Sequence, residues 1–369
     1  MSLDRTALQT EPLSRRENRV RLPEAAIDPD AAVAPPPDDL LEHGIRELAA
    51  AIRAARSTGA PRVLAYGAHL IKNGLGTVLI RLIEEGWISG LATNGAGIIH
   101  DWELAFQGAT SEDVRDNIAN GRFGLWEETG RYLNLALAVG ALRKLGYGEA
   151  VGALIHHDGL EIPSERELCT EARQLADTDP EHAAAACDLL TLVRRFALPA
   201  GRIDVAHPYR AYSVQAAAYR LRIPCTGHPM FGHDIIYTHP MNHGAAVGRT
   251  AERDFLRFAG QVAELDGGVY LSVGSAVMSP MIFEKSFAMA NNLALQKGMP
   301  IDSHSIFVVD LSPAPSVWEH DIEPETDDPA YYLRFLKTFN RMGGRMRYLC
   351  GDNRTVLPRL YRLLKEAPQ

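Results

Sequence analysis

The chain has 369 residues, a mass of 40.5 kDa and a formal net charge of −8 at pH 7. This acidic balance leaves no basic surplus to meet phosphate backbones and argues against a nucleic-acid-binding protein. No apolar run reaches membrane-spanning length, and the first residues lack the apolar core of a signal peptide. We therefore expect a cytoplasmic protein whose partners are neither nucleic acid nor membrane.

Residues 1–37 are polar and proline-rich, and they end in Ala-Pro-Pro-Pro. This composition predicts an extended N-terminal arm. The arm either is pinned to an acidic surface by its arginines or is a solvated tail; these arginines are Arg15, Arg16, Arg19 and Arg21. We expect residues 38–369 to form a single α/β domain, because no convincing linker or internal repeat interrupts them.

The first hundred residues predict one β–α–β unit after an initial helix that follows Asp38-Asp39. An apolar run from Pro61 predicts a buried strand, and a helical apolar pattern follows over 78–83. Residues 87–93 predict a second strand, which ends in the small-residue turn 94–97. The following stretch is mostly helical, with a long helix over 126–145 and a helical region over 149–198 that has a polar break at 176–180.

Strands and helices alternate again towards the C-terminus. Strands are expected near 203–206, 223–226, 269–273, 306–309 and 346–350. Helices are expected near 212–221, 245–265, 279–297, 331–342 and 357–365. This alternation predicts an α/β fold with a doubly wound, mostly parallel, Rossmann-like sheet.

The stretch 267–311 carries the clearest functional signal. Its strand ends in the small residues Gly274, Ser275 and Ala276, and Ser279-Pro280 then begin a helix. Small residues at such a junction let a ligand approach the backbone and the helix N–H groups, and open parallel sheets bind ligands at their carboxyl ends. The alternative is that these residues only allow the helix to pack closely on the strand.

Common catalytic motifs are absent: the sequence has no GxGxxG at a strand–helix junction, no GxxxxGK[ST], no GxSxG and no HExxH. The loop 227–244 is rich in potential metal ligands, namely His228, His233, Asp234, His239 and His243. Their spacing fits no standard metal motif, so we assign no metal ligand. A metal-dependent hydrolase built on this loop remains an alternative to a polar active-site loop or surface histidines.

Two segments resemble deoxyhypusine synthase. The first, 63–103, is similar to that family's first β–α–β unit, whose second strand ends in a glycine-rich turn followed by acidic residues. The second runs from Ile223-Pro224 through the histidine loop to the strand end VYLSVGSAVMSP at 269–280. The resemblance implies a Rossmann-like fold that binds NAD, assembly into homo-oligomers (dimer or tetramer), and a small amine-type ligand.

The resemblance also assigns roles to individual residues. The residues expected along the dinucleotide are His69, Lys72, Asn73, Thr93, Asn94, Gly95, Gly97, Asp101, Gly274, Ser275 and Asp310. His100 and Asp101 stand where the family has an acidic pair, so only Asp101 keeps the charge. Asp234 matches an aspartate that holds the amine substrate.

The departures from the family concern its chemistry. The family's nucleophilic lysine lies in a Trp-Gly-Lys motif, whereas Trp318-Glu319-His320 stands here, and histidine cannot form the imine. We therefore do not expect this chain to make deoxyhypusine. Among its six lysines, Lys72 and Lys285 lie near the expected ligand edge, where either is a nucleophile or an ordinary solvated or paired lysine.

Three functions follow as hypotheses. The first is an NAD-dependent transferase or oxidoreductase with different chemistry, in which His233, Asp234, His320 and Lys285 are the catalytic candidates. The second is a ligand-binding protein without catalytic activity. The third is the metal-dependent hydrolase. Turnover separates the first from the second, and bound metal favours the third.

Overall fold

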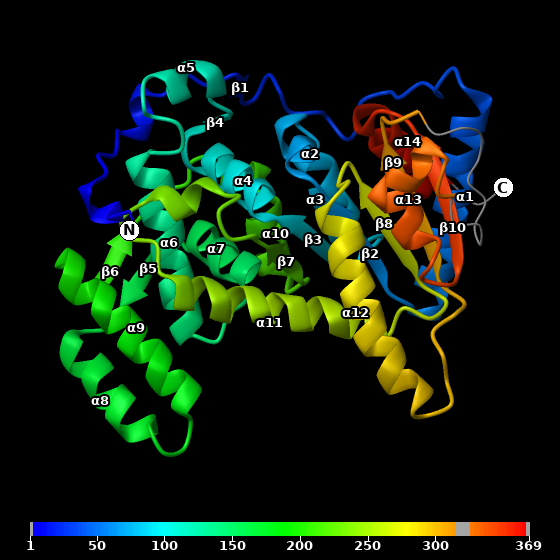
Figure 1. The fold of residues 1–369 in the computed structure, drawn as a ribbon. Coiled ribbons are helices and arrows are strands. Elements are labelled where there is room, and N and C mark those ends of the chain that lie inside the picture. The colour runs from blue at the N-terminus through cyan, green and yellow to red at the C-terminus, as the bar shows by residue number, and fades with distance from the viewer. Residues whose placement is uncertain (1–2, 314–324, 367–369) are drawn as a thin grey trace. The chain divides into compact units, whose positions relative to one another are not determined.

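The structure, a computed structural model, describes residues 3–313 and 325–366. These residues form two compact units (Figure 1). The helical unit comprises the N-terminal residues to Glu24, Ile98–Arg220 and Pro229–Asp254; the sheet unit comprises Ala25–Gly97, Leu221–His228 and the residues from Phe255 onwards. Our single α/β domain over 38–369 stays a prediction.

The sheet unit is built on six strands that are all parallel to their neighbours. Their order is β10-β9-β8-β2-β3-β7. The strands are β2 (Arg62–Tyr66), β3 (Gly90–Asn94), β7 (Cys225–His228), β8 (Val269–Val273), β9 (Ser305–Asp310) and β10 (Arg345–Cys350). The predicted doubly wound, Rossmann-like α/β fold is thereby confirmed.

Helices cover both faces of this sheet. One face packs on α1 (Asp39–Thr58), α3 (Gly76–Glu84) and α14 (Asn353–Lys365). The other face packs on the second half of α11 (Gly244–Ala263), on α12 (Met278–Leu295) and on α13 (Arg334–Phe339). Because both faces are covered, the strands are almost continuously buried, as in β8, where every residue is buried.

Local signals set the ends of these helices. The carboxylate of Asp38 accepts a hydrogen bond from the Leu40 backbone N–H (2.9 Å) at the start of α1. Gly59 ends α1 in the left-handed conformation, at φ +79°. The predicted helices over 245–265, 279–297 and 357–365 are present within a few residues as α11, α12 and α14.

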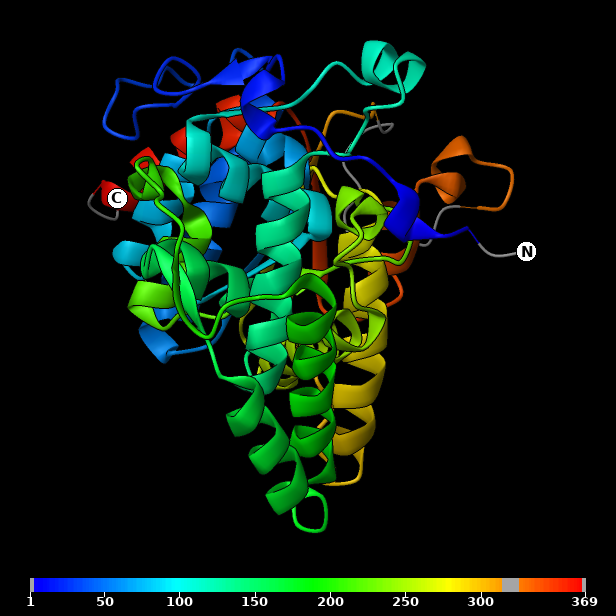
Figure 2. The ribbon, with the colours of Figure 1, turned by 90° about the vertical axis from the view of Figure 1, so that its left-hand side faces the viewer.

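The helical unit surrounds its own apolar core, which is centred on α6 (Glu127–Leu142) and α7 (Tyr147–His156). Figure 2 shows α8 (Glu165–Leu175) and α9 (Pro180–Phe196) as an antiparallel pair, joined across the predicted polar break. The remaining elements of this unit are β1 (Val20–Arg21), α4 (Gly95–Gln107), β4 (Ala109–Thr110), α5 (Val114–Ala119), β5 (Gly159–Ile162), β6 (Gly201–Asp204), α10 (Val214–Leu221) and short 3₁₀ turns. Of α4, the residues from Ile98 onwards belong to this unit, and of α10, the residues up to Arg220. No helix among the described residues has both the length and the apolar composition needed to cross a membrane.

The prediction that 149–198 is mostly helical missed one strand. Residues 159–162 form β5, which pairs antiparallel with β6. This strand is only four residues long and one of them is the exposed Glu161, so its local pattern is weak. Its partner lies about 40 residues later in the chain, and tertiary pairing rather than propensity determines the strand.

The N-terminal segment packs on the helical unit. The guanidinium of Arg16 forms two hydrogen bonds with the carboxylate of Glu103, at 2.7 and 2.6 Å, and both side chains are almost completely buried. Leu13 is buried in the core, and Arg19 pairs with Asp113 at the surface. Burial raises the pKa of Glu103, but Arg16 and the other polar partners of the carboxylate together bring this pKa below its ordinary value, so the carboxyl group stays ionised. Arg16 and Arg19 therefore hold the N-terminal segment to acidic residues of the helical unit.

The first prediction concerns this buried pair. Arg16→Ala leaves the Glu103 carboxylate buried without its counter-charge, so we expect the free energy of unfolding to fall by about 3 kcal/mol. Arg15→Ala is the matched control, because Arg15 is exposed and pairs with Glu11 at the surface, where the loss is below about 1 kcal/mol. Urea unfolding measures both, and equal losses would contradict the structural role of Arg16.

Candidate functional site

The order of the parallel strands reverses at one place in the sheet. From β2 the chain goes on to β3 and β7 on one side, and from β8 it goes on to β9 and β10 on the other side. β2 and β8 are neighbours, with Tyr66 opposite Val273 at their carboxyl ends. In open α/β sheets the crevice outside the strand ends at such a reversal is where ligands bind.

Glycines bring the backbones together at this reversal. The N–H of Gly67, directly after β2, donates to the carbonyl of Val273 (3.2 Å), and the N–H of Gly274 donates to the carbonyl of Val309 (2.9 Å). A Cβ atom on Gly67 would lie 2.1 Å from the carbonyl oxygen of Gly274, which no side chain tolerates. Gly274 itself has φ +55°, a conformation that favours glycine. The two strand ends therefore present bare backbone.

The end of β3 forms the start of α4. The hydroxyl of Thr93 donates to the carbonyl of Tyr66 (2.9 Å), and Oδ1 of Asn94 accepts a hydrogen bond from the N–H of Gly97 (2.8 Å). A Cβ atom on Gly97 would lie 2.2 Å from the Thr93 hydroxyl, so this position requires glycine. The predicted small-residue turn 94–97 is thus the capped first turn of a helix.

Polar side chains lie after β2. In the short helix α2 (Ala68–Lys72), the Nζ atom of Lys72 lies 3.4 Å from Nε2 of His69. Burial, and then the neighbouring Lys72 charge, lower the pKa of His69, while burial lowers the pKa of Lys72. The amide of Asn73 donates to Asn353 (3.0 Å) at the start of α14.

The ends of β8 and β9 carry two further predicted residues. The buried hydroxyl of Ser275 accepts a hydrogen bond from the N–H of Ser279 (3.2 Å) at the start of α12. Asp310 accepts two hydrogen bonds at 3.0 Å from the backbone and hydroxyl of Ser312. Both residues therefore stabilise the strand ends. Asp310 lies two strands away from β2 in the sheet.

The predicted dinucleotide residues of the sheet unit thus all lie at or after the carboxyl ends of its strands. Asp101 lies in the helical unit, fully buried. Its carboxylate accepts hydrogen bonds from the Ser213 hydroxyl, from the Val214 and Gln215 backbones and from the Gln215 side chain. Burial raises the pKa of Asp101. This carboxylate caps α10, and its assignment to a cofactor stays a prediction.

The catalytic candidates lie in different places. His320 lies outside the described residues. Lys285 is exposed on α12 and pairs with the adjacent Glu284, as in the ordinary paired interpretation. His233 is exposed in the loop of the helical unit, beside Asp234.

Asp234 has the environment of an acid–base group. Burial raises its pKa to about 6, and its Oδ2 atom has no hydrogen-bond partner among the described residues. The hydroxyls of Tyr237 and Tyr147 are also buried without hydrogen bonds there. Burial raises the pKa of Tyr147, and the nearby Asp234 raises it further. Sequence reasoning missed both tyrosines: Tyr237 stands in the loop itself but was not singled out, and only the fold brings Tyr147 near this loop.

His228 and His239 have internal hydrogen-bond partners, whereas Nδ1 of His243 is buried without one among the described residues. His239 accepts a hydrogen bond at Nδ1 from the Met241 N–H (3.1 Å), so its Nε2 carries the proton donated to Glu127 (3.2 Å). His228, at the end of β7, is buried, and burial lowers its pKa to about 3. Within residues 3–313 and 325–366, no group of three or more potential ligands is placed to hold a metal ion.

No family model and no curated protein sequence matches the chain. Several solved structures are similar to the chain at low sequence identity and low TM-score. A conserved putative LOR/SDH protein from Methanococcus maripaludis S2 has 14% identity and a TM-score of 0.43, over 97% of this chain and 75% of that one. A putative deoxyhypusine synthase from Entamoeba histolytica has 8% identity and a TM-score of 0.38, over 89% of each chain.

The third similar structure is AgrE in complex with ornithine and NAD⁺, with 14% identity and a TM-score of 0.37 over 77% of this chain and 29% of that one. The chain spans about a third of the length of other AgrE structures and of the cyanobacterial arginine dihydrolase ArgZ. Identities this low, with TM-scores below 0.5, carry no information about the chemistry of this chain.

A substitution at Gly67 tests the strand reversal. Gly67→Ala places a methyl group against the Gly274 carbonyl, so we expect a loss of about 1–3 kcal/mol in the free energy of unfolding. Gly260→Ala is the control, since Gly260 lies in helix α11 with no atom within 4 Å of a new Cβ. Alanine there should stabilise the protein by about 0.5–1 kcal/mol. Urea unfolding that finds Gly67→Ala neutral would show that the backbones do not meet.

The environment of Asp234 predicts a pH dependence. Its pKa is higher in the folded than in the unfolded protein, so the folded state loses stability as pH rises from about 4 through 6. Asp234→Asn removes this loss, and we expect it to be more stable than the wild type by about 1–3 kcal/mol at pH 8 but not at pH 4. Urea unfolding at both pH values measures this, with the exposed Asp177→Asn as control. A difference that does not change with pH would contradict the buried state of Asp234.

Proposed function

We propose that the sheet unit binds NAD or a related nucleotide at the carboxyl ends of β2, β3 and β8. The strand reversal between β2 and β8 carries this proposal. This sheet has three strands on each side of the reversal. In sheets with this strand order, a dinucleotide binds across the crevice outside the carboxyl ends of the strands. The chain lacks the usual glycine fingerprint, and Gly67 and Gly274 supply the close backbone approach instead.

The residues at this edge suit a dinucleotide in three respects. Gly274 and Ser275 offer backbone for the phosphates, as do the N–H groups in the first turn of α4, where the helix dipole favours negative charge. Lys72 supplies a cation. The amide nitrogen of Asn94 supplies a hydrogen-bond donor, while the amide oxygen of Asn94 caps α4. When bound, NAD would supply a hydride acceptor.

We propose further that the protein is an enzyme acting on a small amine-type or other metabolite. Asp234 supports catalysis rather than binding alone, because a carboxyl group with a pKa of about 6 exchanges protons near neutral pH. His233 is the neighbouring acid–base candidate. With Lys285 paired to Glu284, an imine-based deoxyhypusine reaction has little support.

The nucleotide proposal is tested by calorimetric titration with NAD. We expect saturable binding that weakens about tenfold or more in Lys72→Gln, because a charge-assisted contact to phosphate is lost. Lys297→Gln is the control, since Lys297 follows the C-terminal end of α12, away from the strand ends. No binding at millimolar NAD, or equal weakening in both variants, would contradict the proposal.

We also propose that the chain associates with copies of itself. Four large apolar side chains are exposed on and just after the end of α12: Met289, Leu293, Leu295 and Met299, between 43% and 64% exposed. Such a patch is typical of an interaction surface. Sedimentation should find a dimer or tetramer that Leu293→Glu weakens, whereas a wild-type monomer at micromolar concentration would contradict this proposal.

A further inference from the structure

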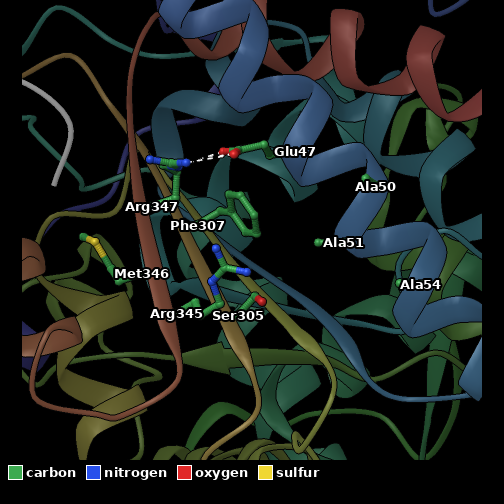
Figure 3. Close-up of a pocket in the computed structure, with 9 residues that line it drawn as sticks. All are labelled: Glu47, Ala50, Ala51, Ala54, Ser305, Phe307, Arg345, Met346 and Arg347. Carbon is green, nitrogen blue, oxygen red and sulfur yellow. Dashed lines mark hydrogen bonds and ion pairs between the residues drawn. The ribbon is translucent and has the colours of Figure 1, made fainter. Parts of the chain in front are cut away.

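A cavity of about 480 Å³ in the sheet unit lies between α1 and strands β9 and β10 (Figure 3). Its walls come from α1, through Glu47, Ala50, Ala51 and Ala54. Its floor comes from the strands, through Ser305, Phe307, Arg345, Met346 and Arg347. The volume is within the range of pockets that hold small metabolites.

The space exists because of the residues on both sides. The alanines on one stripe of α1 leave room where larger side chains would close the gap to the sheet. Across from them, Ser305 pairs in register with Arg345, and Phe307 pairs with Arg347. These four side chains share a face of the sheet, because they lie two residues apart along their strands. The Phe307 ring, 6% exposed, forms the apolar floor.

The two arginines of the cavity differ in whether a carboxylate pairs with them. Arg347 donates two hydrogen bonds, each 2.8 Å long, to the carboxylate of Glu47, and this pair closes one end (Figure 3). Arg345 has no ion pair and Ser305 no side-chain hydrogen bond within the described part of the chain. The guanidinium of Arg345, which is unpaired among the described residues, lies beside the apolar floor.

This cavity is distinct from the proposed nucleotide edge. Ser305 and Arg345 are the first residues of β9 and β10, so they lie at the amino ends of the strands. The reversal with Gly67 and Gly274 lies at the carboxyl ends. A ligand in one place therefore leaves the other open.

We propose that the cavity is a binding site for a small organic monoanion, a carboxylate on a planar apolar body. The fork of the Arg345 guanidinium matches a carboxylate bidentately, and the Ser305 hydroxyl supplies a further donor. The planar body lies against Phe307 and the alanine methyl groups. The unpaired charge of Arg345 favours an anion over a neutral molecule of the same shape.

The test uses 2-naphthoate as the probe and its fluorescence as the signal, without NAD present. We expect saturable binding, about tenfold or more weaker for the neutral 2-naphthamide and for Arg345→Gln. Ala54→Leu, at an exposed alanine of the stripe that lines the cavity, should abolish binding by filling the cavity while thermal unfolding shows an intact fold. Arg334→Gln, at an exposed arginine of α13, is the control and should bind like the wild type.

The proposal is overturned by no saturable binding of 2-naphthoate. It is also overturned if Arg345→Gln and Ala54→Leu bind like the wild type, or if the amide binds as well as the acid. Adding saturating NAD should leave naphthoate affinity unchanged. Competition between the two would place both at one site and contradict the separate cavity.

Discussion

The structure of the sheet unit depends on the contact of two backbones, at Gly67 and Gly274. β2 and β8 must be neighbours for the chain to extend the sheet in both directions, and their ends meet with almost no space between them. Any side chain at Gly67 would push the strands apart. The same lack of side chains leaves backbone groups open at the place where the strand order reverses, which is where this type of sheet offers a ligand site.

The helical unit depends on a different kind of interaction, buried charges with complete sets of partners. Glu103 is held by Arg16 and by the hydroxyls of Thr110 and Thr129, and Asp101 by the start of α10. These groups place α4 relative to the N-terminal segment and to α10. Asp234 contrasts with them, since it is largely buried and its Oδ2 atom lacks a hydrogen bond among the described residues. An incompletely satisfied carboxyl group of this kind is typical of a functional position.

Much of the fold could be predicted from the sequence, because the parallel strands are short apolar runs and the helices carry caps such as Asp38. The position of the candidate edge was predictable for the same reason, since small residues directly follow β3 and β8. The strand β5 was not, because its pattern is local and weak and its partner is distant. Three of the five places where the chain passes between the two units lie within α4, α10 and α11, so no linker composition marks them.

The roles of individual residues were harder to predict than the position of the candidate ligand edge of the sheet. A resemblance in sequence placed Asp101 at the dinucleotide, but nothing local shows that Ser213 and Gln215 fold back onto its carboxylate. Gly67 was not singled out, although a glycine directly after a buried strand is a signal for close backbone approach. Tyr147 comes near Asp234 only through the packing of α7 in the helical unit.

Hydrogen–deuterium exchange with and without saturating NAD tests the central claim most directly. If the nucleotide lies across the strand reversal, NAD should slow exchange in peptides covering 66–73, 93–97 and 273–277. Exchange at the opposite ends of the strands, near 62, 305 and 345, should stay unchanged. Protection confined to other segments, or no protection at millimolar NAD, would contradict the account.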